Sequence, residues 1–394
     1  MSGFHPQKVF ISACFGMLIY GIVMTVLGSI LPSVILKFDL DKADAGSLFV
    51  MLSFGIVGGS LVFGPLVDRF GYKPLLTASA GLIILTFQGI AHAPSVYLLY
   101  AAIFCTGFAG GAINGGTNAL VSDISEGRRG SRLTYLGVFF GIGAFGVPLL
   151  LGSLLDRFSY EAIISTVGAM IVLPLLLFLV LQFPRPKHNR GFPLTESAGL
   201  FRQRPLILFG FVLFFQGGLE MSMGGWSATY FLEVHEVASR YSVLLLSLFW
   251  FGLTLARFFQ GRILLSMSGS TVLDISFALS LAGSLVLLLS GHTGIAVAGL
   301  FVVGIGFAAI FPVILSFVGE MYARLSGTAF SIVFVIALGG GMSVPWLIGI
   351  LADRIGLQTA MMIIPFCVAG GFIVYRVAMR YQNRSEVVSA GETA

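Results

Sequence analysis

Charged side chains are scarce in this sequence of 394 residues: Lys, Arg, Asp and Glu together make up only 10%. A soluble domain carries roughly 25% charged residues, because its surface must be hydrated. So few charges cannot cover a water-soluble body of this size, which excludes a soluble enzyme, a nucleic-acid-binding module and a disordered scaffold. Apolar residues are abundant instead, at 57%, with 51 glycines and 37 phenylalanines. This composition is typical of a chain whose surface faces lipid.

Cysteine and histidine are also few. The three cysteines, Cys14, Cys105 and Cys367, lie in apolar runs and predict no disulfide framework. The five histidines fall in predicted loops or tails, which disfavours an intramembrane metalloenzyme or any bound metal. No Ser-His or Cys-His arrangement can be assembled inside the predicted helices, and no phosphate-binding loop indicates an ATP-driven pump. We therefore expect neither enzyme activity nor a cofactor.

Twelve apolar stretches are each long enough to cross a membrane as a helix, which takes roughly 20 residues. One long polar segment, 184–203, divides them into six and six. We therefore predict an all-α integral membrane protein with a six-helix bundle over 1–183, a linker over 184–203, and a second bundle over 204–394 that ends in a short tail. The predicted spans are 9–36, 44–68, 74–92, 95–122, 132–155, 161–183, 204–232, 239–265, 270–290, 293–319, 326–352 and 358–379.

Lys and Arg are distributed unevenly between the two predicted faces. An even number of spans places both termini on one face, and seventeen of the 22 basic residues fall there. Basic residues concentrate on the cytoplasmic side of membrane proteins, so we predict cytoplasmic termini in a multi-pass protein of the plasma (inner) membrane. The same asymmetry explains the net charge of +5 without any nucleic acid. The expected partners are membrane lipid and a small-molecule substrate, and we expect a monomer.

The pattern G-x-L-x-D-R occurs three times. The second and third copies are 197 residues apart, half of the chain length, so the two halves are repeats of one six-helix unit. The first copy ends a span at the other face, which indicates three-helix repeats of inverted topology and a substrate site near the midplane. A fourth copy, from Gly261, lacks the Asp-Arg pair. The three full copies begin at Gly64, Gly152 and Gly349 and end in Asp68–Arg69, Asp156–Arg157 and Asp353–Arg354.

The stretch GPLVDRFGYKP, residues 64–74, resembles the signature loop of the major facilitator superfamily between its second and third helices. Gly64, Asp68, Arg69, Gly71 and Lys73 stand at the family's positions. The resemblance implies the major facilitator fold of two pseudo-symmetric bundles, with these residues and the other two Asp-Arg pairs in conformational gating. We expect Gly64 to let two helices approach closely, and Asp68 to bond the partner bundle when that face is closed. The alternative is a plain polar turn with basic residues at the membrane boundary.

Two further segments resemble the fucose permease and glucose/galactose symporter branch of that superfamily. This resemblance implies a facilitator of hexose-like sugars, often coupled to a cation. The first predicted helix lacks the acid of fucose permease, and the fourth has asparagines instead, which puts proton coupling by that route in doubt. The matching residues are Glu220, Gly225, Trp226 and Tyr230 in segment 217–231 and Asn118 in segment 110–123.

Glu220 is the one acidic residue that we predict near the centre of a span, where an ionisable group is costly and marks function. Gln216 lies one turn earlier on the same face, and a carboxylate beside an amide matches hydroxyls that both donate and accept. Asn114 and Asn118 form a similar pair on another span. We predict that these four residues bind the substrate, and Glu220 is also the candidate for coupling to a proton or sodium ion. The alternatives are a structural carboxyl and an interhelical clamp by the asparagines.

Four aromatic residues, Tyr20, Trp226, Tyr230 and Trp250, are predicted to stack on the apolar face of a sugar. For Trp226 and Tyr230 an aromatic belt at the membrane interface is an equal alternative. Gly224 and Gly225 are predicted to unwind their helix beside the site. No Lys or Arg is expected near the centre, which argues against a phosphate or carboxylate substrate.

The sequence therefore predicts a secondary active or facilitative transporter that moves a neutral, hydroxyl-rich solute, a hexose-like sugar, by alternating access. Two alternatives stay open. An efflux antiporter for lipophilic or cationic compounds would use Glu220 to compensate the charge of the cation. A non-transporting membrane sensor is the other, although no appended soluble domain supports it.

Overall fold

The computed structural model describes residues 4–125, 129–185, 200, 203–322 and 326–391. Within these ranges the regular elements are helices, and twelve helical segments are long and apolar enough to cross a membrane. The prediction of an all-α membrane protein with twelve spans is confirmed. Most of the predicted linker, 186–199 and 201–202, lies outside the described residues, so the predicted domain boundaries stay predictions.

Both bundles contain helices that are apolar on nearly all sides. A helix satisfies its own backbone groups, so it can lie in lipid without other hydrogen-bond partners. The first bundle contains α1 (Pro6–Phe38), α2 (Lys42–Phe70), α3 (Tyr72–Ala91), α4 (Val96–Ile124), α5 (Arg129–Leu154), α6 (Tyr160–Met170) and α7 (Val172–Val180). The second contains α9 (Arg204–Glu233), α10 (Ser239–Ser266), α11 (Gly269–Leu289), α12 (Thr293–Phe307), α13 (Ile310–Met321), α14 (Ser326–Ile355), α15 (Leu357–Met361) and α16 (Ile363–Gly391).

Three of the predicted spans are interrupted. They are the pairs α6 and α7, α12 and α13, and α15 and α16. The interruption between α12 and α13 falls at Ala308 and Ala309, near the middle of the span, and it leaves backbone carbonyls free to accept hydrogen bonds from side chains. The last helix continues to Gly391, past its predicted end at 379, so the predicted tail is largely helical.

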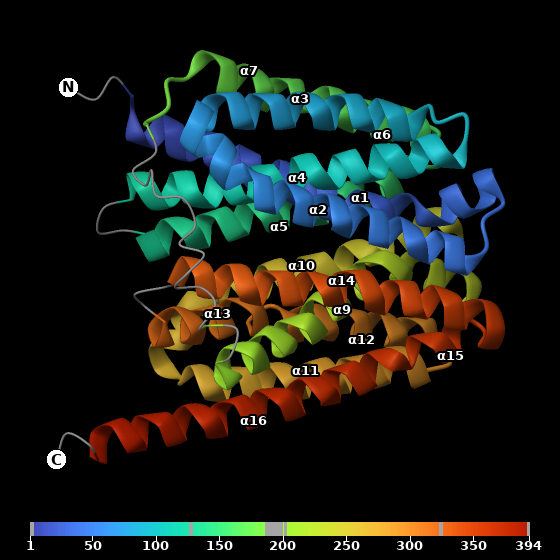
Figure 1. The fold of residues 1–394 in the computed structure, drawn as a ribbon. Coiled ribbons are helices and arrows are strands. Elements are labelled where there is room, and N and C mark those ends of the chain that lie inside the picture. Colours follow the sequence, from blue (N-terminus) through green and yellow to red (C-terminus); the bar gives the residue numbers. More distant parts are fainter. Residues whose placement is uncertain (1–3, 126–128, 186–199, 201–202, 323–325, 392–394) are drawn as a thin grey trace.

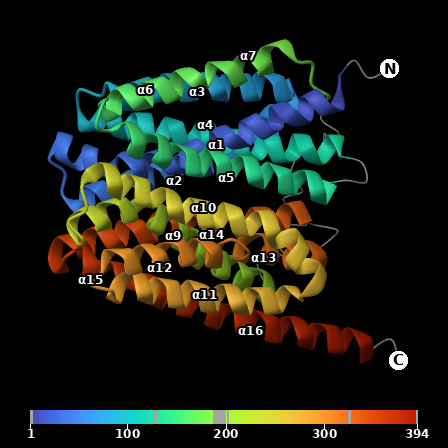
Figure 2. The same ribbon diagram turned by 180° about the vertical axis from the view of Figure 1, so that it is seen from behind.

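The two bundles lie side by side, with both termini at one face of the molecule (Figure 1). We call this the terminal face and the other the opposite face. Helix α2 contacts α14 along one seam, α5 contacts α10 along a second seam, and α1 contacts α9 between them. Figure 1 shows the first seam from the front and Figure 2 shows the second from behind.

Glycines allow the closest contacts between helices. A Cβ on Gly28 would collide with the backbone of Gly224 and Gly225, so α1 and α9 cross in direct backbone contact. Residue 28 plus 197 is residue 225, so this crossing is the same point in both repeats. Helix α9 is continuous through these glycines, and the predicted unwinding is wrong: the missing side chains serve the crossing instead. The same offset relates the α4–α2 contact at Gly107 to the α12–α10 contact at Gly304.

Candidate functional site

Three polar side chains meet inside the second bundle. On α9, Gln216 and Glu220 are one turn apart, and Gln216 Nε2 lies 3.5 Å from Glu220 Oε2. On α10, Arg257 Nη2 lies 3.8 Å from the same carboxylate oxygen. The side chains of Glu220 and Arg257 are 14% and 18% exposed, so both are largely but not completely buried. We call Gln216, Glu220 and Arg257 the central cluster.

The interruption between α12 and α13 fixes two members of this cluster. Gln216 Nε2 donates to the backbone oxygen of Phe307 at 3.2 Å, and Arg257 Nε donates to that of Ala308 at 3.4 Å. The other end of the Gln216 amide, Oε1, is buried and accepts no hydrogen bond from the described residues. A buried acceptor without a donor costs about 1–3 kcal/mol. The amide is therefore oriented at one end and offers an acceptor at the other.

Arg257 corrects the expectation that no basic side chain lies near the centre. In the sequence it counts with the terminal-face charges, because it lies nine residues before the end of α10. Its long side chain nevertheless reaches Glu220. Removing a lone carboxylate from water costs several kcal/mol, and a paired arginine offsets much of that cost. The pair also makes the formal charge of the central cluster zero.

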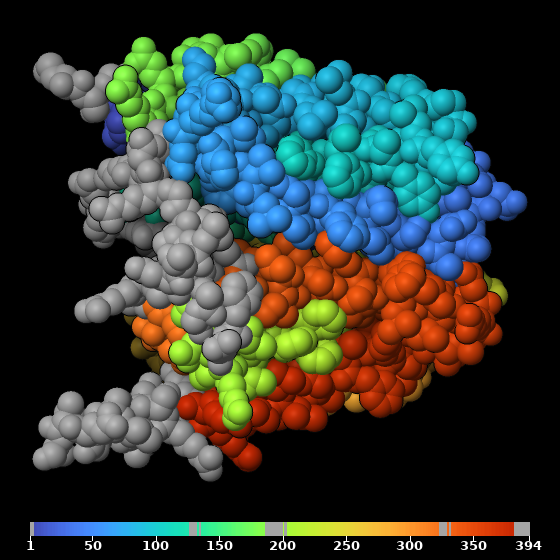
Figure 3. Space-filling model, in the orientation of Figure 1, coloured from blue at the N-terminus to red at the C-terminus, as the bar shows by residue number. Residues whose placement is uncertain are grey.

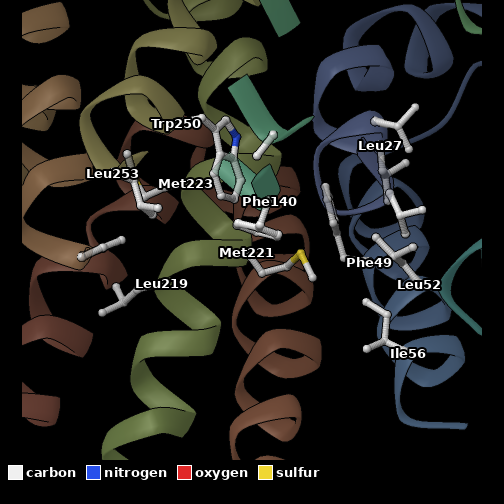
Figure 4. Packing of buried hydrophobic residues seen from close by; sticks show 14 of the residues in the cluster. Leu27, Phe49, Leu52, Ile56, Phe140, Leu219, Met221, Met223, Trp250 and Leu253 are labelled. Atoms are coloured by element: carbon white, nitrogen blue, oxygen red, sulfur yellow. The ribbon is translucent and has the colours of Figure 1, made fainter. Parts of the chain in front are cut away.

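Phe140 on α5 connects the first bundle to the central cluster. The guanidinium carbon of Arg257 lies 5.5 Å from the centroid of the Phe140 ring, a cation–π contact. The same ring lies 5.6 Å from the ring of Tyr20 on α1 and 6.2 Å from that of Trp250 on α10. Figure 4 shows Phe140 and Trp250 next to each other at the seam. Tyr20 and Trp250 thus both contact the ring that touches Arg257, and stacking of either ring on a substrate stays a prediction.

Asn114 and Asn118 on α4 bond mainly to each other. Asn118 Nδ2 donates to Asn114 O at 2.9 Å and to Asn114 Oδ1 at 3.0 Å, and it lies 3.8 Å from the sulfur of Met17 on α1. Met17 is three residues before Tyr20, so the pair lies about one turn nearer the terminal face than the Phe140 contacts. Among the described hydrogen bonds none connects this pair to the central cluster. Their role in binding stays a prediction.

Trp226 and Tyr230 lie apart from the central cluster, and both are 0% exposed. Trp226 Nε1 donates to the backbone oxygen of Pro345 at 3.0 Å, and its ring packs on Phe49 of α2 with 6.2 Å between centroids. Tyr230 donates to the backbone oxygen of Leu287 on α11 at 3.3 Å. Such burial rules out the alternative of an aromatic belt facing lipid. Stacking of either ring on a substrate stays a prediction.

Residues 197 positions apart in the two halves can be compared to separate those that pack the helices from those that form the candidate site. The glycine contacts repeat, whereas the central cluster and the Asn114–Asn118 pair do not. This difference is the signal that would have identified Arg257 from the sequence. A charged residue inside a span is costly, so one that has no counterpart in the other half indicates a function. The central cluster corresponds to Ile19, Val23 and Ser60 of the first half, and Asn114 and Asn118 correspond to Phe311 and Leu315 of the second.

Charged residues bond the two bundles at the opposite face. The Asp353 carboxylate accepts hydrogen bonds from the backbone N–H of Lys42, at 2.9 Å, and of the next residue, at 2.8 Å. Asp156 pairs with Arg240 at the start of α10. Residues 42 and 43 plus 197 are 239 and 240, so the two aspartates contact equivalent positions of the two repeats, Asp353 through backbone N–H groups and Asp156 through a side chain. Lys42 Nζ also lies 3.2 Å from Glu233 Oε2. We call these contacts the opposite-face gate.

The arginines next to the gate aspartates behave differently. Arg157 and Arg354 are exposed, and the described part of the chain shows no salt bridge for either. In the described part of the chain, the aspartates of these two Asp-Arg pairs therefore bond the partner bundle, and no such bond is seen for the arginines.

The four glycines that begin the repeated motif differ between the faces. A Cβ on Gly152 would meet the backbone of α10, and one on Gly349 would meet that of α2. A Cβ on Gly64 or Gly261 would meet nothing within 4 Å. The bundles are thus packed together at the opposite face, where the atoms of α2 and α14 meet in Figure 3, and not at Gly64 and Gly261. The expectation that Gly64 brings two helices close is wrong for this conformation.

The remaining residues of the signature loop lie where α2 ends and α3 begins. Asp68 and Arg69 are exposed, and Lys73 is half-buried. Gly71 has a φ of +86°, a backbone conformation that glycine adopts without strain. Tyr72, which follows it, donates to Asp123 Oδ2 on α4 at 2.7 Å. The loop is therefore anchored to its own bundle.

Known proteins with similar sequences include membrane transporters. Residues 13–332 match the model of the family described as Major Facilitator Superfamily. The uncharacterized MFS-type transporter YfkL of Bacillus subtilis (strain 168) is 25% identical, over 86% of this chain and 87% of that protein. The glucose/mannose transporter GlcP of the same organism is 22% identical, over 84% of each. The crystal structure of a D-xylose–proton symporter superposes with a TM-score of 0.81, at 13% identity, over 94% of this chain and 97% of that one.

Proposed function

Because the chain belongs to the major facilitator superfamily, we propose that it transports a neutral, hydroxyl-rich small solute, a hexose-like sugar, by alternating access. The family and the fold are those of transporters. The observation that carries the choice of solute is the charge-paired central cluster, in which Glu220 faces Arg257 beside the free acceptor of Gln216. The similarity to a glucose/mannose transporter and a D-xylose symporter supports the same class.

A sugar hydroxyl both donates and accepts a hydrogen bond, so a site for it needs groups of both kinds. Glu220 and Gln216 Oε1 supply acceptors, and Arg257 supplies donors beyond the one that bonds Ala308. A neutral solute leaves the Glu220–Arg257 pair balanced, whereas a charged one must disturb it. This argument favours a neutral polyol over a lipophilic cation, because Arg257 already compensates Glu220.

The conformation supports a mechanism in which the bundles rock about the central cluster. In this structure the bundles are bonded at the opposite face, through Asp353, Asp156 and the motif glycines. The inverted repeats predict that in the other conformation Gly64 and Gly261 pack against the partner bundle. Asp68, exposed here, would then reach a group across that seam.

We propose that the terminal face lies in the cytoplasm of a plasma (inner) membrane, and the positive-inside distribution of Lys and Arg supports this orientation. In that orientation the present conformation is closed to the outside. We propose that the transporter works as a monomer, since each chain contains both bundles and the complete central cluster.

Coupling to a proton or sodium ion is a separate question, for which Glu220 is the candidate. We favour a binding role for Glu220, because its carboxylate is engaged by Arg257 and Gln216 rather than by a second acid. Glu220→Gln is then expected to weaken solute binding by about tenfold, and an imposed pH gradient should drive little accumulation in the wild type. A pH-driven accumulation that Glu220→Gln abolishes without a change in affinity would establish coupling instead.

The experiment that tests the function is uptake of labelled solutes into proteoliposomes. The panel contains D-glucose, D-xylose, a nucleoside and a lipophilic cation, each with and without a pH or sodium gradient. We expect uptake of a sugar that Glu220→Gln and Arg257→Gln both reduce. Glu320→Gln is the matched control, since this acid on α13 bonds Ser316 outside the central cluster. Transport of the cation but of no sugar would establish the efflux alternative, and transport of nothing would favour a sensor.

A further inference from the structure

Two phenylalanine rings lie parallel on the second bundle, and one of them follows the helix interruption that holds the central cluster. The rings of Phe311 on α13 and Phe334 on α14 have centroids 5.9 Å apart and planes inclined by 1°. Phe330, one turn before Phe334, continues the stack at 6.2 Å and 25°. Phe334 is 37% exposed and Phe311 is half-buried, so the rings are not sealed in the bundle interior. We call Phe311 and Phe334 the aromatic platform.

The platform is adjacent to the central cluster along the chain. Phe311 follows Phe307 and Ala308 by about one turn, and these are the residues whose carbonyls hold Gln216 and Arg257. One turn of helix rises about 5.4 Å, which is comparable to the width of a sugar ring. A solute as wide as a sugar ring therefore matches the spacing along this span between the carbonyls that hold the central cluster and Phe311.

Phe334 also lies on the face of α14 that packs against the other bundle. Seven residues are about two turns of a helix, so Phe334 shares a face with Gly341. The backbone oxygen of Gly341 accepts a hydrogen bond from Ser53 of α2 at 3.4 Å. Phe334 is nearer the terminal face than this contact, on the side where Gly64 has no neighbour within 4 Å. It thus borders the side from which, in this conformation, a solute would arrive.

We propose that the aromatic platform binds the apolar face of a ring-shaped solute, and so makes the transporter select cyclic sugars over open-chain polyols. This inference rests on the proposed function and names the form of its substrate. A pyranose ring presents C–H groups on its flat faces and hydroxyls around its edge. Its face stacks on the platform while its edge hydroxyls bond the central cluster. An open-chain polyol has the same hydroxyls and no flat face.

The two repeats support this division of roles. Phe311 corresponds to Asn114 at the offset of 197, so equivalent positions of the two bundles carry a phenyl ring and an amide. At this one level of the repeat, the second bundle carries the ring and the first bundle carries the amide. This asymmetry suits a solute that is itself apolar on one side and polar on the other.

The test compares D-glucose with D-sorbitol, its open-chain counterpart, as competitors of labelled D-glucose counterflow in proteoliposomes. Wild-type protein should prefer D-glucose. Phe311→Leu and Phe334→Leu keep an apolar side chain but lose the ring. Each should lower the apparent affinity for D-glucose by about two- to tenfold. The apparent affinity for D-sorbitol should change by less than twofold, so the preference for D-glucose over D-sorbitol becomes smaller. Phe258→Leu is the matched control, because this phenylalanine is 61% exposed and pairs only with its neighbour Phe259 in the described ring contacts.

The possible outcomes separate this inference from the function beneath it. If wild-type protein transports D-glucose but both leucine variants keep its affinity and preference, the platform inference is wrong and the proposed function stands. If both variants lower the apparent affinity for D-sorbitol as much as that for D-glucose, the rings stabilise the fold of the site and the inference is again wrong. If wild-type protein transports no sugar, both the platform inference and the proposed function are wrong. Purified yield and melting temperature show whether each variant is folded.

Discussion

The bonds of the opposite-face gate allow us to estimate how much one substitution should destabilise closure at that face. Asp353 accepts hydrogen bonds of 2.9 and 2.8 Å from two backbone N–H groups at the start of α2. A hydrogen bond to a charged group contributes about 1.5–3 kcal/mol, and a negative charge at a helix N-terminus adds about 0.3–1 kcal/mol. Asp353→Asn removes the charge but keeps one acceptor, and the site is exposed. We therefore expect a loss of roughly 1–2 kcal/mol, which raises the population open at the opposite face about 5- to 30-fold.

The assay measures how fast a cysteine at the seam reacts with a membrane-impermeant maleimide added from the opposite face. Ser53 on α2 is 0% exposed and bonds Gly341 of the partner bundle, so Ser53→Cys reacts only when the seam opens. The three native cysteines are replaced in the parent. Asp353→Asn should raise the labelling rate about 5- to 30-fold. Arg354→Gln is the control, since this exposed neighbour makes no described contact with the other bundle. A rate for Asp353→Asn within twofold of the parent would refute the reasoning.

Four further substitutions test other parts of the account. Gly349→Val should raise the same labelling rate, because its side chain would collide with α2. Gly64→Val has free space in this conformation but would hinder the other one, so it should leave the labelling rate unchanged or lower it. A rise of the same size in both variants would contradict this. Asp68→Asn should slow exchange of solute with an apparent affinity within a few-fold of wild type, and a large loss of affinity with normal exchange would count against a gating role. Asn118→Ala should raise the apparent Kd by about tenfold, for one lost hydrogen bond. A sharp fall in its melting temperature with normal affinity would indicate a structural role.

The fold could be predicted from the sequence because lipid imposes a simple rule. Every spanning segment must be apolar over about 20 residues and helical, so composition and length alone identify twelve spans. Repeats at an offset of 197 then predict two related bundles, and Gly28 and Gly225 meet as that offset requires. Interruptions inside spans, such as the one at Ala308, are invisible to hydropathy because the residues on both sides are equally apolar.

The site could be predicted only in part. Glu220 and Gln216 share a helical turn, so sequence spacing predicts their contact. The sequence counts Arg257 with the terminal-face charges, since a position near a helix end does not show how far a long side chain extends into the bundle. Phe140 is one of 37 phenylalanines, and nothing in its neighbourhood along the chain separates it from the others. Contacts between bundles depend on the packing of α5 against α10, which local sequence does not specify.

The central claim is that a charge-paired central cluster binds a neutral, hydroxyl-rich solute. The most direct measurement is competition of labelled D-glucose counterflow by unlabelled D-glucose and by D-glucuronate, which differ by one carboxylate. With Glu220 balancing Arg257, D-glucose should compete at least about tenfold better, because an added carboxylate must displace or repel Glu220. Stronger competition by D-glucuronate would contradict the claim, and would make Arg257 the binding residue for an anionic solute.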